Sequence, residues 1–172
     1  TKTASASATL DFTEFDNATY STYIFVCDNV KPATDLAYFQ MRFSTDAGAS
    51  YDSGASAYDW VVQGWNSSNS NLQTGKVSTF IGLTHDAGTG DAGVGNAAAE
   101  FGVTGEITLY SAATASVRSR VVTALAYDNG SGNAVIMNGS GRRNAAQDTD
   151  AVRFLFSAGN ITSGTIRMYG LA

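Results

Sequence analysis

Hydrophobic and polar residues alternate along most of this chain with a period of two, the spacing of a half-buried β-strand. The last third shows the pattern most clearly, in two segments joined by residues 158–160, which can form a turn. Apolar residues share one face of each segment: Val152, Phe154 and Phe156 in residues 150–157, and Ile166 and Met168 in residues 163–171. This pattern predicts a C-terminal β-hairpin.

The rest of the chain repeats this rhythm and has no segment with a convincing helical period. Further strands are expected at residues 8–15, 22–30, 36–44, 58–65, 77–83, 103–110 and 117–127, and another begins at residues 134–138. In the long segment, Arg118 and Arg120 share one face, opposite Val117, Val121 and Leu125. Residues 66–75 predict a polar loop and residues 139–149 a linker, whereas Asn129-Gly130 favours a tight hairpin turn.

These segments predict about nine or ten strands, at spacings typical of two-sheet proteins. At 172 residues the chain is expected to form a single domain, residues 1–172. The predicted fold is all-β: an antiparallel two-sheet β-sandwich, jelly-roll-like, with a closed β-barrel as the alternative. Residues 1–9 are small and polar, unlike a signal peptide, and predict an extended N-terminal arm.

Composition excludes several function classes. The net charge is −5, and the largest cluster of basic residues is the pair Arg142-Arg143, so nucleic acid is not an expected partner. No apolar run approaches the roughly 20 residues that span a membrane, so no membrane association is expected. The single cysteine, Cys27, lies in an apolar run and is expected to be a buried hydrophobe that forms no internal disulfide.

One stretch matches the Asp-box pattern, in which a serine, an aspartate, a glycine and an aromatic residue recur at fixed spacing. Its members here are Ser44, Asp46, Gly48 and Tyr51. The aspartate accepts backbone N–H groups, the glycine supplies an unusual φ, and the aromatic folds back over the turn. The favoured interpretation is a structural turn. A glycoside hydrolase remains an alternative, which requires two converging carboxyl groups that the sequence does not identify.

Metal and cofactor chemistry find little support. A zinc site needs three or four ligands, and His85 and Cys27 are the only histidine and cysteine. Calcium could bind at Asp148 and Asp150 or at Asp86 and Asp91, but neither pair has the spacing of a twelve-residue calcium loop, so solvated turns are the favoured interpretation. We therefore predict no catalytic residue, no metal and no cofactor.

Three aromatic residues, Tyr58, Trp60 and Trp65, lie beside the predicted polar loop. They are candidates for assembly contacts or for stacking against a glycan, because each combines an apolar face with a polar tip. Strand alternation places Tyr58 and Trp60 on one face and Trp65 on the other. A core or intersubunit position is the favoured interpretation.

Three stretches resemble a family of short proteins and domains from tailed bacteriophages and prophages. They are YIFVCDNVKPATD (residues 23–35), FSTDAGASYDSG (residues 43–54) and DAVRFLFSAGNITSGTIRMYGL (residues 150–171). The resemblance implies a virion structural component, and no catalytic residues come with it.

The expected function is therefore that of a non-enzymatic structural protein on the exterior of a phage particle, most simply a capsid decoration or cement protein. The alternatives are a tail fibre or appendage subunit and a carbohydrate-binding, receptor-recognition module whose partner is a host glycan. By analogy we expect a homotrimer that binds the major capsid protein or tail proteins. The arm of residues 1–9 and the Gly/Ala/Asp-rich residues 86–99 are the candidates for reaching a neighbour.

Overall fold

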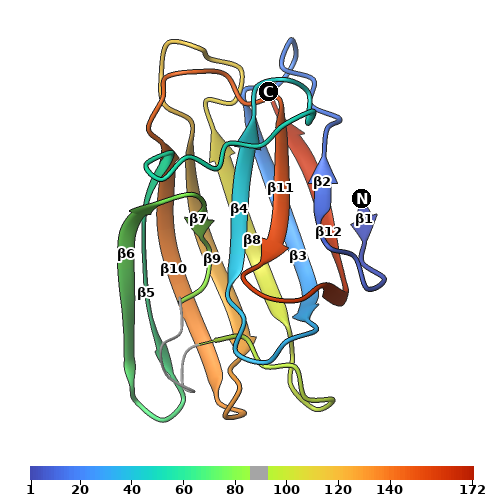
Figure 1. Ribbon diagram of the computed structural model, residues 1–172, viewed down its shortest axis with the longest axis vertical. Helices are drawn as coiled ribbons and strands as arrows, with labels where there is room; N and C mark the ends of the chain where they lie inside the picture. Colours follow the sequence, from blue (N-terminus) through green and yellow to red (C-terminus); the bar gives the residue numbers. More distant parts are fainter. Residues whose placement is uncertain (86–92) are drawn as a thin grey trace.

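The computed structural model describes residues 1–85 and 93–172, which form two antiparallel sheets packed face to face (Figure 1). The larger sheet has the order β1 (Lys2–Thr3), β12 (Ile161–Leu171), β3 (Thr22–Pro32), β8 (Val103–Tyr110), β9 (Arg120–Asp128), β10 (Ala134–Arg143), β5 (Tyr58–Asn66) and β6 (Asn71–Ser78). The smaller sheet has the order β2 (Leu10–Phe12), β11 (Ala151–Phe156), β4 (Phe39–Ser44) and β7 (Ile81–Gly82). The predicted all-β sandwich is confirmed, and the described residues include no helix that could span a membrane.

Consecutive strands repeatedly change sheet, which gives the fold its jelly-roll-like connectivity. The chain crosses between the sheets from β2 to β3, from β3 to β4 and from β4 to β5. It crosses again on both sides of β7 and on both sides of β11. Each sheet keeps two edge strands, β1 and β6 in the larger and β2 and β7 in the smaller, so the closed-barrel alternative is wrong.

The two C-terminal strands do not form the predicted hairpin. β11 lies between β2 and β4, whereas β12 lies between β1 and β3 in the other sheet. Their apolar faces meet the same core from opposite sides, with Phe154 and Ile166 both fully buried. Residues 158–160 therefore connect two layers rather than two neighbours, with Gly159 at a φ of 69°. Alternation identified both strands, but it carries no information about which strands pair.

Two further segments differ from the prediction. The polar residues 71–75, expected in a loop, belong to edge strand β6, and the chain then bends so that β7 joins the smaller sheet. Residues 139–143, expected in a linker, continue β10. Glycine is required there, because a Cβ on Gly139 would lie 2.6 Å from the Val62 side chain and one on Gly141 would lie 2.4 Å from Ile81.

Aromatic rings fill the space between the sheets. Phe154 of β11 lies with its ring centroid 5.2 Å from that of Phe25 in the larger sheet. It also lies 5.9 Å from Phe12 and 5.6 Å from Phe39 of its own sheet. All four side chains are essentially inaccessible to solvent. This aromatic layer holds the two sheets together, because each ring removes a large apolar area from water.

The single cysteine lies in β3, and the N-terminal residues lie at the nearby edge of the larger sheet. Cys27 is buried in β3, as the sequence predicts, and burial raises the pKa of its thiol to about 12. The N-terminal arm lies along its own domain: Lys2 and Thr3 pair with Ile166 and Thr165, and Ser7 bridges Ile161. The arm thus extends the larger sheet by a short edge strand.

Candidate functional site

The outward face of the larger sheet is the most distinctive surface of the molecule. In β5 and β9 every second residue is buried on the inward side, as are four of the five inward residues of β10, and the intervening residues face outward. Three outward valines, Val61, Val77 and Val122, are between 46% and 55% exposed, and we call them the valine patch. Val61 and Val122 are both directly opposite Ser140, one on each side of β10.

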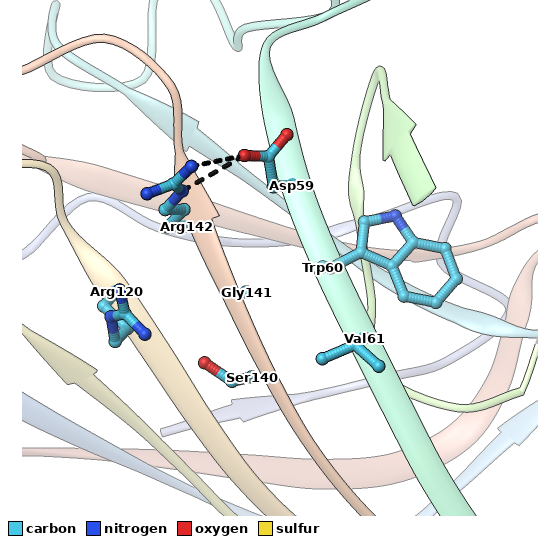
Figure 2. A pocket seen from close by; sticks show the side chains of 7 residues that line it. All are labelled: Asp59, Trp60, Val61, Arg120, Ser140, Gly141 and Arg142. Carbon is cyan, nitrogen blue, oxygen red and sulfur yellow. Dashed lines mark hydrogen bonds and ion pairs between the residues drawn. The ribbon is translucent and has the colours of Figure 1, made fainter. Parts of the chain in front are cut away.

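A charged row crosses the sheet beside Val61 (Figure 2), in which Asp59, Arg142 and Arg120 lie opposite one another in turn and Val77 lies opposite Asp59. Arg142 donates to Asp59 Oδ2 from Nε at 3.1 Å and from Nη2 at 2.7 Å. Asn144 donates to the other carboxylate oxygen at 3.0 Å, and together these hydrogen bonds lower the pKa of Asp59. Arg120 lies directly opposite Arg142 and has no ion pair within the described residues. The valine patch therefore has an uncompensated positive charge at its border, beside a shallow hollow of ≈ 330 Å³.

The adjacent arginines of β10 point in opposite directions. Arg142 faces outward, whereas Arg143 is fully buried between the sheets. The Arg143 Nε atom lies 2.8 Å from a carboxylate oxygen of Asp52, and Nη1 donates to the backbone oxygen of Asp148 at 2.8 Å. Its guanidinium also lies 5.6 Å from the centre of the Phe43 ring. Arg143 thus ties two loops to the core, and only Arg142 contributes to the outer surface.

The three aromatic candidates are separated by strand alternation. Tyr58 and Trp60 point into the sandwich and are buried, which is the core position that the favoured interpretation gave them and leaves neither side chain exposed for a glycan. The Tyr58 hydroxyl oxygen accepts the Phe43 N–H at 2.8 Å, and Trp60 Nε1 donates to Ser78 Oγ at 3.0 Å. Both side chains therefore stabilise the sandwich, and burial raises the pKa of Tyr58. Trp65 faces outward and is 54% exposed.

The Asp-box residues form a compact turn after β4. The Asp46 carboxylate accepts the Ser50 N–H and hydroxyl and the Ser44 hydroxyl, and Gly48 N–H donates to Ser44 Oγ. These bonds lower the pKa of Asp46 to about 2. Gly48 has a φ of 86°, and the Cζ atom of Arg153 lies over the Tyr51 ring, 4.1 Å from its centre. All the hydrogen bonds that the Asp46 carboxylate accepts come from Ser44 and Ser50, which belong to the same turn. This arrangement fits a structural role.

Two of the remaining candidates, Asp86 and Asp91, lie outside the described residues. Among the residues that the structure places, no group of three or more His, Cys, Asp and Glu could hold a metal ion. Of the predicted loop 86–99, the described part includes Val94, which is buried and bridges Ala37 and Asn129.

Sequence reasoning found some of the outward residues and missed others. It placed Arg120 opposite Val121 correctly, but β9 begins at Arg120, so Val117 lies in the preceding turn. It did not single out Val61, Val77 or Val122. Exposed β-branched residues at alternate positions of strands were the available signal, but alternation alone does not say which face is covered.

Comparisons of the chain with protein-family models, with curated proteins and with solved structures find no significant match. The function is therefore inferred from the outward face of the larger sheet and from the residues that border it.

Proposed function

We propose that this chain is a non-enzymatic structural protein on the exterior of a tailed phage particle, most simply a capsid decoration or cement protein. The observation that carries the proposal is the valine patch, which leaves Val61, Val77 and Val122 about half exposed on a sheet face that the smaller sheet does not cover. Val61 lies diagonal to Val77 and two strand spacings from Val122, and apolar side chains that gather on an uncovered sheet face are typical of interaction sites. The resemblance of residues 23–35, 43–54 and 150–171 to phage virion proteins supplies the biological setting.

Attachment would proceed by burial of this face against a neighbouring virion protein. Burial of apolar surface contributes roughly 25 cal/mol per Å², and a stable interface takes about 800 Å² from each partner. Arg120 has no ion pair among the residues that the structure describes, so the partner surface should present a carboxylate opposite it. A homotrimer that bridges neighbouring capsomers is the assembly we propose, and a tail appendage would use the same contacts.

Two matched substitutions test the attachment. Val122→Lys places an ammonium group within the valine patch, and Val117→Lys makes the same change at a residue of similar exposure, 43% against 46%, in a turn outside the strands. Particles assembled with each variant are purified, and the chain is quantified and located by electron cryomicroscopy. We expect the wild type and Val117→Lys on the particle exterior and a large loss of Val122→Lys.

A particle from which the wild-type chain is absent would overturn the proposed function. Equal incorporation of both variants would show that attachment uses another surface, and would overturn the assignment of the valine patch.

A further inference from the structure

The far end of the outward face, away from Asp59 and Arg142, is lined by amides. Gln73, Gln63 and Asn138 lie directly opposite one another on β6, β5 and β10 and form a row across three strands. Asn71 lies directly opposite Trp65, one row further along the sheet. All four amide side chains are exposed, and none forms a hydrogen bond within the described residues. We call these four residues and Trp65 the amide platform.

The indole of Trp65 supplies the apolar part of the platform. It is 54% exposed and lies directly opposite Ile136, which is 57% exposed. A hollow of ≈ 330 Å³ lies between these side chains and is lined by Gln63, Gly64, Trp65, Asn71, Ile136 and Asn138. No charged residue lines it. The hollow therefore combines one large aromatic face with neutral hydrogen-bonding groups only.

This chemistry distinguishes the platform from the valine patch. Each amide carries two N–H donors and an acceptor oxygen, so four amides can satisfy a ligand that donates and accepts at every polar atom. Sugar hydroxyls do both, and the C–H face of a sugar ring packs on an indole. A nucleic acid would need cations for its phosphates, and an acidic glycan would need one for its carboxylate. The residues that line the hollow include no cation for either ligand.

We propose that the amide platform binds a neutral saccharide, with one ring stacked on Trp65 and its hydroxyls bonded to Gln63, Asn71 and Asn138. The row of amides spans two strand spacings, about 10 Å, which gives room for one or two sugar rings. This site is independent of the attachment through the valine patch, since it uses different side chains.

The test uses the full chain on a printed array of neutral and acidic glycans, followed by titration of the best neutral binder in solution. Trp65→Ala should weaken binding by at least about tenfold, as expected for an aromatic anchor at the centre of a site. Gln63→Leu, which keeps the side-chain size and removes the amide, should weaken it less. Phe101→Ala is the matched control, because Phe101 is an aromatic residue of 50% exposure outside the platform. It should leave binding unchanged.

Thermal unfolding of each variant checks that the fold is retained. Absence of binding to any neutral glycan, binding to acidic glycans alone, or equal binding by Trp65→Ala and the wild type would each overturn the proposal. If Trp65→Ala binds every glycan as the wild type does but is lost from particles, the platform is a protein contact and the saccharide assignment is wrong. Val122→Lys should keep glycan binding, which separates failure of this site from failure of the attachment.

Discussion

Val121 and Val122 are neighbours in β9, yet one is fully buried and the other is 46% exposed. The same contrast runs through β5 and β10, where the inward face contacts the smaller sheet at β7 and the outward face is covered by no layer of the described residues. A β-branched residue suits a strand on either face, so propensity does not distinguish the two positions. The comparison teaches that the inward face determines stability, and that the outward face is free to carry recognition.

The largest effect is expected in the aromatic layer. Phe154→Ala removes a ring that contacts Phe25 across the core as well as Phe12 and Phe39. We expect a loss of about 3–5 kcal/mol in the free energy of unfolding, from lost transfer energy and the cavity left behind. Urea unfolding followed by tryptophan fluorescence measures it. A loss below about 1 kcal/mol would show that the two sheets are not held together by this layer.

A smaller effect is expected from the valine pair, where one chemical change is made on two faces. Val121→Ala removes two buried methyl groups and should cost about 2 kcal/mol, at roughly 0.8 kcal/mol per buried carbon plus a cavity contribution. Val122→Ala should change the free energy of unfolding by less than about 0.5 kcal/mol, as for most surface substitutions. The same urea titration compares them. Equal costs would contradict the inward and outward assignment of β9.

The smallest effect is expected at the Asp-box turn, which lies on neither face. The pKa of Asp46 is lowered to about 2 by bonds that its ionised form accepts from Ser50 and Ser44. A lowered pKa means that the carboxylate stabilises the fold above its unfolded pKa of about 4, and that this contribution disappears as the pH falls toward 2.

Asp46→Asn removes that titration. The wild type should therefore be more stable than the variant near neutral pH, and the difference should shrink between about pH 4 and pH 2. Thermal unfolding across this range measures it. A difference that stays constant with pH would show that the hydrogen bonds of the turn do not depend on the charge of Asp46.

The alternation of apolar and polar residues was sufficient to predict where a strand lies and which side chains share a face. The expected strand at residues 103–110 coincides with β8, and alternation separated Trp65 from Trp60 correctly. It failed where strands must choose partners: β11 and β12 carry an alternating pattern whether or not they pair with each other. The polar residues 71–75 read as a loop because an edge strand beside solvent needs few apolar residues.

The functional surface illustrates the same limit. The row of Gln73, Gln63 and Asn138 exists only because β6, β5 and β10 pair in a particular register. Residues 63 and 138 are far apart in the sequence, and each amide taken alone is an ordinary surface residue. The sequence pointed to Trp65, but the groups that would accompany it depend on long-range pairing.

The position of β11 and β12 has a consequence for how this protein reaches its native state. β11 is inserted between β2 and β4, and β12 between β1 and β3, although all four partners precede them in the chain. Neither sheet can form strand by strand in chain order, because each has an inner strand that comes last in the sequence. The chain must lose loop-closure entropy before the contacts between these distant strands stabilise it. This places folding in the slow, milliseconds-to-seconds class. Nascent chains will therefore expose unpaired strand edges until β12 is in place, and that interval is when they are most vulnerable to aggregation.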